Sequence, residues 1–261
     1  MSGNGAGSLY APERHDLILS RARAQGRVEV NALAEDLGVT AETVRRDLTA
    51  LERRGHVRRV HGGALPIERL EVEPTLAVRK EQASIEKQRI AARAVEELPV
   101  EGTVLLDSGT TTQAIADQFP RDRDLTVVTN SVAIASTLQD YPQVDLYLLG
   151  GHVRHRTGAA VGDWLTSALE AVCVDVAFLG TNGFSVHRGM TTPAQAEARA
   201  KRAMVQAARR VVVVSDSTKA GFDHFHRFAR TEEVALLITD TALDDETAEQ
   251  LDDAGTDVVR A

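Results

Sequence analysis

The stretch that decides the fold of the first part of the chain is Thr40–Arg54, TAETVRRDLTALERR, which continues into Gly55–Ala64, GHVRRVHGGA. Within it Val44, Leu48 and Leu51 recur at helical spacing, so that one narrow side of a helix is apolar. The pattern predicts a helix whose apolar side packs on a small core while the other side faces outward.

The outward side of this predicted helix carries Arg46, Thr49 and Arg53, with Glu42 and Thr43 near its beginning. Such a face fits the major groove of DNA, where arginine can form two hydrogen bonds with guanine and threonine can contact a thymine methyl or a phosphate. For a single helix, an ordinary surface helix with solvated charges is the better interpretation. The neighbouring segments decide between the two.

Upstream, Glu13–Gln25 reads as a first helix, with Leu17, Ile18 and Ala22 facing inward and Gly26 ending it. The helix would contribute one side of a small core. It therefore belongs to the same unit as the Thr40–Arg54 helix.

A second helix is expected between these two. Arg27–Val30 is a short extended piece, and Asn31 is a plausible N-cap for a helix over Ala32–Leu37 that Gly38 ends. Thr40 can cap the next helix, although the capping box is incomplete. Two helices joined by a tight glycine-containing turn, the second basic on its outer face, predict a helix-turn-helix over about residues 28–47.

After this motif His56–Val60 alternates as a strand, and His61-Gly62-Gly63 forms a turn. The pair predicts a β-wing whose Arg58 and Arg59 reach phosphates or a minor groove; the alternative is a solvated hairpin edge. The expected DNA-contacting residues are Thr40, Glu42, Thr43, Arg45, Arg46, Thr49, Arg53, Arg58, Arg59 and His61.

The composition agrees with one DNA-facing patch. At 261 residues the chain is long enough for two domains. Its net charge of -8 argues against nucleic-acid binding through bulk charge. Residues 13–65, however, hold ten arginines and eight acidic residues, a net +2, whereas residues 66–261 carry -10.

No targeting or metal-binding pattern is present in the sequence. The first eleven residues are small and polar, so we expect a disordered arm rather than a signal peptide. The lone Cys173 lies in an apolar run and is expected in the core, and no cysteine–histidine spacing predicts a metal or other cofactor. We expect a cytoplasmic protein without a membrane span.

The second part of the chain alternates short apolar runs with helical patterns. The runs are Val104–Leu106, Leu125–Val128, Val144–Leu149, Val174–Leu179, Val211–Val214, Val234–Ile238 and Asp257–Val259. The helical patterns are Glu86–Leu98, Thr111–Phe119, Ser131–Gln139, Ala194–Arg209 and Asp244–Leu251. The alternation predicts an α/β domain with a mainly parallel sheet covered on both faces.

Small hydroxyl, amide and glycine residues follow the predicted strands, at the sheet edge where ligands bind in such folds. DSGTTT, Asp107–Thr112, is the best phosphate cradle, because glycine permits a close turn and the threonines offer donors. Helix capping and tight turns explain the same residues without a ligand. The expected contacts are Asp107, Ser108, Gly109, Thr110, Thr111, Thr112, Asn130, Arg154, Thr181, Asn182, Gly183 and Lys219.

Two basic residues among these have alternatives that stay open. Lys219 can neutralise a phosphate or lie in a surface loop, and Arg154 can do the same or be exposed. Glu197 and Lys201, spaced four residues apart, are expected to form a helix-stabilising pair.

LAEDLGVTAETVRRDLTALERRGHVRRVHGGAL resembles the DNA-binding signature of the DeoR/GlpR family of bacterial sugar-catabolism repressors, chiefly in TVRRDL and VHGGA. LLDSGTTT, VVTNS, LLGG, FLGTNGFSVHRGMTTP and VVSDSTKAG resemble the family's effector-sensing domain, which is similar in fold to ribose-5-phosphate isomerase. The resemblance implies a repressor that a phosphorylated sugar releases from operator DNA. It implies ligand roles for Asp107, Gly109, Thr110, Thr111, Thr112, Asn182, Gly183 and Lys219.

The alternative function is a sugar-phosphate isomerase with an appended DNA module. The related isomerases use carboxylates after the strand that corresponds to Val174–Leu179, whereas this chain has Gly-Thr-Asn-Gly, which cannot take a proton at neutral pH. We therefore expect no enzyme.

The expected organisation is an arm (1–11), a winged helix-turn-helix domain (12–66), a linker (67–84) and an effector-sensing domain (85–261). The expected partners are double-stranded operator DNA, a phosphorylated sugar and further copies of the chain, with no membrane.

Overall fold

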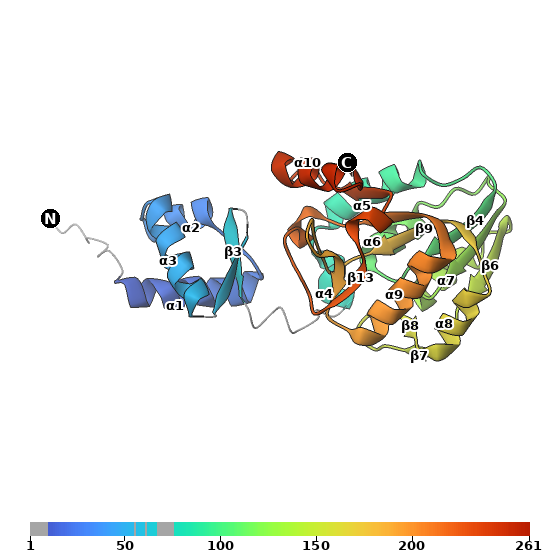
Figure 1. The fold of residues 1–261 in the computed structure, drawn as a ribbon, viewed down its shortest axis with the longest axis horizontal. Helices are drawn as coiled ribbons and strands as arrows, with labels where there is room; N and C mark the ends of the chain where they lie inside the picture. Colours follow the sequence, from blue (N-terminus) through green and yellow to red (C-terminus); the bar gives the residue numbers. More distant parts are fainter. Residues whose placement is uncertain (1–9, 55, 61, 67–75) are drawn as a thin grey trace. The chain divides into compact units, whose positions relative to one another are not determined.

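The structure is a computed structural model that describes residues 10–54, 56–60, 62–66 and 76–261. It divides into two compact units, Met1–Glu73 and Pro74–Ala261 (Figure 1). The expected arm, the turn residue His61 and residues 67–75 of the expected linker lie outside the described residues, apart from the arm's last two positions.

The N-terminal unit consists of three helices and a small antiparallel sheet. The elements are α1 (Ala11–Gln25), β1 (Val28–Glu29), α2 (Val30–Leu37), α3 (Ala41–Arg53), β2 (Val57–Val60) and β3 (Gly63–Pro66), with strand order β1-β3-β2. The helix-turn-helix is therefore α2 and α3, joined through Gly38 in the left-handed conformation (φ 63°). The β2–β3 hairpin is the expected wing.

The apolar stripe of α3 packs as its spacing predicts. Val44, Leu48 and Leu51 are at most 1% exposed and lie in one core with Ile18 and Ala22 of α1. Leu17, expected to face inward with them, is 39% exposed. The wing closes against this core at Gly63, where a Cβ atom would lie 2.0 Å from the carbonyl oxygen of Val28, so a side chain there would push β1 and β3 apart.

The start of α2 differs from the sequence prediction, and the start of α3 agrees with it. Helix α2 begins at Val30, with Glu29 as its N-cap, and not after Asn31. The reason is that Val30 is buried, and its N–H donates to the carbonyl of Gly62 in the wing. Thr40 caps α3 as expected, because its hydroxyl accepts the N–H of Thr43 at 3.2 Å.

The C-terminal unit is built on a seven-stranded parallel sheet. Its strands are β4 (Gly102–Leu106), β5 (Leu125–Thr129), β6 (Val144–Leu148), β9 (Val174–Gly180), β12 (Ala208–Val214), β14 (Leu236–Thr239) and β15 (Asp257–Arg260). Their order is β15-β14-β12-β9-β4-β5-β6, so all seven predicted runs are strands of one sheet.

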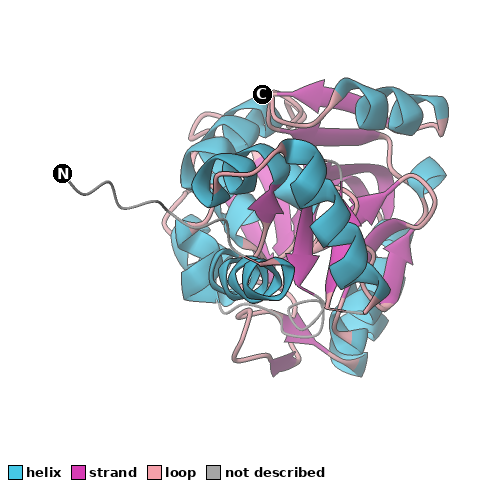
Figure 2. Cartoon of the chain, turned by 90° about the vertical axis from the view of Figure 1, so that its left-hand side faces the viewer, coloured by secondary structure: helices cyan, strands magenta, loops and turns pink. Residues whose placement is uncertain are grey.

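Helices cover both faces of this sheet, as expected for a doubly wound fold (Figure 2). Helices α5 (Ser84–Val95), α6 (Thr110–Asp117) and α7 (Val132–Leu138) pack on one face. Helices α8 (Asp163–Glu170), α9 (Gln195–Ala207) and α10 (Asp245–Asp253) pack on the other.

Several smaller elements had no sequence prediction. They are α4 (Leu76–Glu81), the hairpin of β7 (His152–Val153) and β8 (Ala160–Val161), helix α8, and a sheet of β10 (Gly183–Ser185), β11 (Gly189–Thr192) and β13 (His226–Ala229). Cys173 is exposed in the loop between α8 and β9, so its expected place in the core is wrong. Within the described chain, no helix is both long and apolar enough to cross a membrane.

The strand order places a topological switch point between β4 and β9. From β4 the chain runs outward through β5 to β6, then returns to the other side of β4 and continues through β9, β12, β14 and β15. The loops after β4 and β9 therefore leave the sheet in opposite directions and open a crevice at their carboxyl ends, where ligands of such folds bind.

Candidate functional site

The outer face of α3 presents a set of exposed arginines. Arg45, Arg46 and Arg53 are exposed, and Arg45 has only a loose ion pair with Glu42 at 3.6 Å. Arg46 and Arg53 have no ion pair or hydrogen bond with another described residue. This leaves their guanidinium groups available to a nucleic acid.

The wing is held to α3 by two of that helix's side chains. The backbone N–H of Arg59 donates to Glu52 Oε1 at 2.8 Å, and the Arg59 guanidinium donates to the Thr49 hydroxyl at 3.1 Å. The Thr49 hydroxyl in turn donates to the carbonyl of Arg45 at 2.8 Å, so its methyl group is what remains for a base. Arg58 is half-buried, and Thr40 and Thr43 bond to each other through their hydroxyls at 2.9 Å.

A buried ion pair fixes α3 on α1. Asp47 lies on the buried side of α3 and accepts hydrogen bonds from Arg14 at 2.5 and 2.9 Å, with the His15 ring at 3.1 Å. Burial opposes ionisation of Asp47, but Arg14 and His15 outweigh it and lower the pKa of the carboxyl. The arrangement sets the angle at which α3 presents its arginines.

In the C-terminal unit a small cavity of about 20 Å³ lies at the carboxyl ends of the strands. We call it the strand-end cavity. It is lined by Arg79, Gln82, Lys87, Gly109, Thr110, Thr111, Thr112, Gly180, Thr181, Val214, Ser215, Asp216 and Lys219. Six of the expected ligand residues, Gly109 to Thr112, Thr181 and Lys219, therefore meet there.

The lining of the strand-end cavity suits an anion. Helix α6 begins at Thr110, so backbone N–H groups of its first turn lack intrahelical partners and point at this end. Arg79, Lys87 and Lys219 supply three positive charges against the single negative charge of Asp216. Such a set of donors and cations recognises a phosphate group.

Burial lowers the pKa of two of these cations. Burial, opposed by Asp216 and reinforced by Lys219 and Arg79, lowers the pKa of Lys87 to about 8. Burial also lowers the pKa of Lys219, again against Asp216 and with Arg79. A bound anion would relieve both shifts, because it adds the negative charge that the ammonium groups lack.

Arg79, Gln82 and Lys87 had no predicted role in the site. Arg79 and Gln82 belong to the segment expected to be a linker, and Lys87 belongs to the first turn of α5. One signal was available in the sequence: in a chain with 30 basic residues, only four are lysines, and Lys87, Lys201 and Lys219 all lie in or directly behind this crevice.

Asp107 supports the crevice from behind and does not line the cavity. Its carboxylate pairs with Lys201 and accepts the N–H of Gly180 at 3.2 Å. Complete burial raises the pKa of Asp107, against the opposing effect of Lys201. Glu197 and Lys201 do not form the direct ion pair expected of them, because each has a nearer partner: Lys201 pairs with Asp107, and Glu197 with Arg154. The charge of Lys201 still acts on Glu197 and lowers the pKa of its carboxyl.

The other predicted contacts also lie outside the lining. Asn130 accepts the N–H of Ser108 at 2.9 Å and donates to the carbonyl of Ala160 at 3.0 Å, which positions the loop after β4. Arg154 is held by Glu197, whose pKa is lowered because Lys201, Thr157 and Arg154 outweigh its burial.

Asn182 and Gly183 follow β9 on the side of the small sheet. The carbonyl of Asn182 lies 3.2 Å from the His224 ring, and a Cβ on Gly183 would lie 2.4 Å from the carbonyl oxygen of Phe222. The close approach of Phe222 accounts for this glycine.

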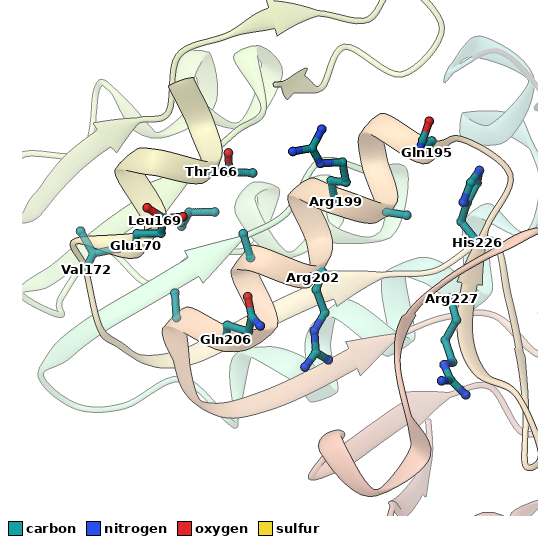
Figure 3. A pocket seen from close by; sticks show the side chains of 13 residues that line it. Thr166, Leu169, Glu170, Val172, Gln195, Arg199, Arg202, Gln206, His226 and Arg227 are labelled. Carbon is teal, nitrogen blue, oxygen red and sulfur yellow. The ribbon is translucent and has the colours of Figure 1, made fainter. Parts of the chain in front are cut away.

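A roomier groove of about 640 Å³ lies between α8, α9 and β13 (Figure 3). It contains Arg199, Arg202 and Arg227 but none of the predicted ligand residues. Arg202 pairs with Glu233 at 2.7 Å and Arg199 with Asp163 at 3.5 Å, so two of its three arginines already have a counter-ion. The strand-end cavity therefore remains the candidate ligand site of the C-terminal unit.

Comparison with known protein families assigns both units. Residues 14–69 match the model of the DeoR-like helix-turn-helix domain, and residues 82–241 match that of the DeoR C terminal sensor domain. The chain belongs to the DeoR family. It is thus a DeoR-family transcriptional regulator with a DNA-binding N-terminal unit and a C-terminal sensor unit.

Relatives of this DeoR-family chain match it over nearly its whole length. The HTH-type transcriptional regulator GlpR of Haloferax volcanii is 42% identical over 96% of this chain and 98% of its own. The HTH-type transcriptional repressor GlcR of Bacillus subtilis is 32% identical over 96% of both chains. The glycerol-3-phosphate regulon repressor of Escherichia coli is 31% identical over 87% of this chain and 90% of its own.

Among solved structures, ribose 5-phosphate isomerase A of Methanocaldococcus jannaschii aligns with 53% of the DeoR-family chain and 55% of its own, at a TM-score of 0.40 and 15% identity. The probable sor operon regulator of Shigella flexneri aligns with 70% of this chain and 95% of its own, at a TM-score of 0.41 and 13% identity.

Proposed function

We propose that this regulator is a repressor that binds operator DNA through α3 and the wing, and that a phosphorylated sugar bound in the strand-end cavity releases it. The observation that supports an effector in this cavity is that Arg79, Lys87 and Lys219 all lie at the first turn of α6. A phosphate dianion matches this charge, and a polyol chain matches the hydroxyls of Thr110–Thr112 and Thr181.

The name of one relative supports a phosphorylated polyol as the ligand: it is the glycerol-3-phosphate regulon repressor of Escherichia coli. We take phosphorylated ketohexoses as the first candidates, followed by aldohexose phosphates, pentose phosphates and glycerol phosphate.

On the DNA side, Arg46, Arg53 and the methyl of Thr49 would face the bases, while Arg45, Arg58 and Arg59 would contact phosphates. The protein would act as a dimer or larger assembly that sets two α3 helices on half-sites about one helical turn apart, or a multiple of it. Sedimentation of the purified chain with and without operator DNA measures that assembly.

The test combines two titrations of the full-length protein. Binding to a fluorescent fragment of the DNA upstream of its own gene is measured by anisotropy, with fructose 1-phosphate, fructose 6-phosphate, glucose 6-phosphate and glycerol 3-phosphate added in turn. Thermal melting with the same compounds reports binding directly, because a ligand of the native state raises its melting temperature.

Free fructose and inorganic phosphate serve as controls for the two halves of the ligand. Release of the DNA by one phosphorylated compound, absent with its free sugar, supports the proposal. Turnover of an aldose phosphate to a ketose phosphate by the purified chain would instead support the isomerase alternative.

A further inference from the structure

Helix α4 is held over the strand-end cavity by one buried ammonium. Lys87 Nζ donates to the carbonyl of Arg79 at 2.6 Å and also to the carbonyl of Gln82. The Arg79 carbonyl belongs to the last turn of α4, where carbonyls have no partner within the helix. Two of the three ammonium protons of Lys87 are therefore used to hold the C-terminal end of α4.

The strand-end cavity cannot accept a sugar phosphate as it stands. Its volume of about 20 Å³ is close to the minimum for a single water molecule. Three of its walls are the ends of β9 and β12 and the beginning of α6, all of which belong to the buried sheet and its covering helices. The fourth wall is α4, a helix of six residues, and so short a helix is not stable on its own.

The connection between α4 and α5 holds an unfavourable conformation. Ala83 has φ 50° and ψ 40°, the left-handed region that a residue with a Cβ atom avoids, and it is the one non-glycine residue with positive φ in the described part of the chain. The docked position of α4 is thus maintained against local strain.

We propose that Lys87 is a latch whose ammonium exchanges partners. With no effector it bonds the carbonyls of Arg79 and Gln82 and keeps α4 docked. When α4 moves away, a phosphate takes the ammonium, because a charge-assisted bond to phosphate is stronger than one to a neutral carbonyl. The carbonyls then have no donor, and α4 stays out of the cavity. This inference rests on the proposed effector site.

The exchange gives the effector a route to the DNA-binding unit. Helix α4 is the first element of the unit that begins at Pro74, and the N-terminal unit ends at Glu73. A displaced α4 therefore moves the point from which the chain leads to the helix-turn-helix. Lys87 also supplies the differential contact that any effector needs to shift a two-state equilibrium, since it binds carbonyls in one state and phosphate in the other.

The first experiment needs no ligand and compares Lys87→Met with Lys80→Met in the full-length protein. Lys80 carries the same charge and lies on α4 itself, but it is exposed and has no hydrogen bond or ion pair with another described residue, whereas Lys87 bonds the end of α4. Hydrogen–deuterium exchange of the α4 amides and operator affinity by anisotropy are measured for both variants.

We expect Lys87→Met to speed exchange in α4 and to weaken operator binding without ligand by at least about fivefold, the lower end of ordinary allosteric coupling. Lys80→Met should leave both quantities unchanged. The latch is overturned if the α4 amides of Lys87→Met exchange as slowly as in the wild-type protein. It is also overturned if this variant melts cooperatively and binds the operator with wild-type affinity.

Ala83→Gly tests the latch in the opposite direction and does not depend on Lys87→Met folding. Glycine removes the Cβ penalty of the docked state. Release of half of the operator DNA should therefore need at least about threefold more of whichever of the four tested compounds releases the wild-type protein. An unchanged or lower requirement counts against the latch. If no compound releases the wild-type protein, the proposed effector fails, whereas the ligand-free comparison still decides the latch.

Discussion

The ammonium of Lys201 on α9 lies against the carboxylate of Asp107 at the end of β4, although 94 residues separate them in the sequence. Lys201 also donates to the carbonyl of Gly180 at 2.8 Å, and Gly180 donates its N–H to Asp107 at 3.2 Å. The pair thus joins β4, β9 and α9 behind the strand-end cavity. The loops that line the cavity depend on it for their positions.

Lys201→Met should destabilise the C-terminal unit by about 3 kcal/mol, because it leaves the buried Asp107 without its counter-ion. Hydrogen exchange of the β4 and β9 amides, followed as a function of urea concentration, reports the stability of this unit alone. Arg199→Met is the matched control, since its ion pair with Asp163 is exposed and should contribute less than about 1 kcal/mol. Equal losses in the two variants would contradict the role of the pair.

Asp47→Asn should loosen the N-terminal unit in a pH-dependent way. The folded pKa of Asp47 is below its unfolded value, so its contribution to stability is present above pH about 4 and is lost as the pH falls through the folded pKa. Hydrogen exchange of α1 and α3, corrected for intrinsic rates, should show a large difference from wild type at pH 7 that shrinks in acid. The exposed pair of Arg21 and Asp36 gives the control Asp36→Asn, which should have little effect at either pH.

Arg46→Ala should weaken specific operator binding by about 1–3 kcal/mol if the guanidinium reads a base. Gel shifts with operator and with unrelated DNA, repeated at several salt concentrations, separate the two possible roles. A base contact lowers discrimination and leaves the salt slope unchanged, whereas a phosphate contact lowers the slope by about one. Unchanged operator binding would show that this side of α3 does not face DNA; Arg199→Ala, on the other unit, controls for lost positive charge.

Thr111→Asp should give a repressor that binds its operator but no longer responds to sugar phosphate. Thr111 is buried in the wall of the strand-end cavity, in the first turn of α6, so a carboxylate there would repel the phosphate. The anisotropy titration that defines release measures the effect. Thr166→Asp places the same charge in the groove between α8 and α9 and should respond normally; loss of response there would move the effector site to that groove.

Sugar-phosphate affinity should fall as the pH rises above about 8, whereas an ordinary lysine stays charged up to about pH 10. The pKa of Lys87 is about 8, and only the protonated ammonium attracts phosphate, which is already a dianion at this pH. Binding then takes up a proton, so calorimetry at pH 8.5 in buffers of different ionisation enthalpy should give different apparent enthalpies. In Lys87→Met this buffer dependence should decrease; a full-sized effect there would assign the proton to another group.

The sheet and the helix-turn-helix were predictable because each has a strong periodic signal. Short apolar, β-branched runs such as Val174–Leu179 alternate with helical patterns, which favours buried strands of a covered sheet, and the spacing of Val44, Leu48 and Leu51 favours one side of a helix. The small sheet of β10, β11 and β13 escaped prediction because GFS, GMTT and HRFA are too short and too polar to show a period.

About half of the residues that line the ligand site could not be predicted, for a different reason. The threonines of Thr110–Thr112 stand at a strand end, where the fold class itself indicates a site. Arg79 and Lys87 precede the first strand of the C-terminal unit, and only packing of α4 and α5 brings them to the cavity. Asp107, in contrast, stood in the right motif but is used as internal support, and nothing in the local sequence distinguishes it from a ligand contact.

The size of the strand-end cavity has a practical consequence for crystallography of this family member. A space of about 20 Å³ offers a soaked molecule no room, so crystals grown in the absence of effector should either exclude it or crack as the chain rearranges. Virtual screening against this rigid shape would likewise reject the natural compound on steric grounds. Co-crystallisation, with the compound present before the lattice forms, is the route to the complex.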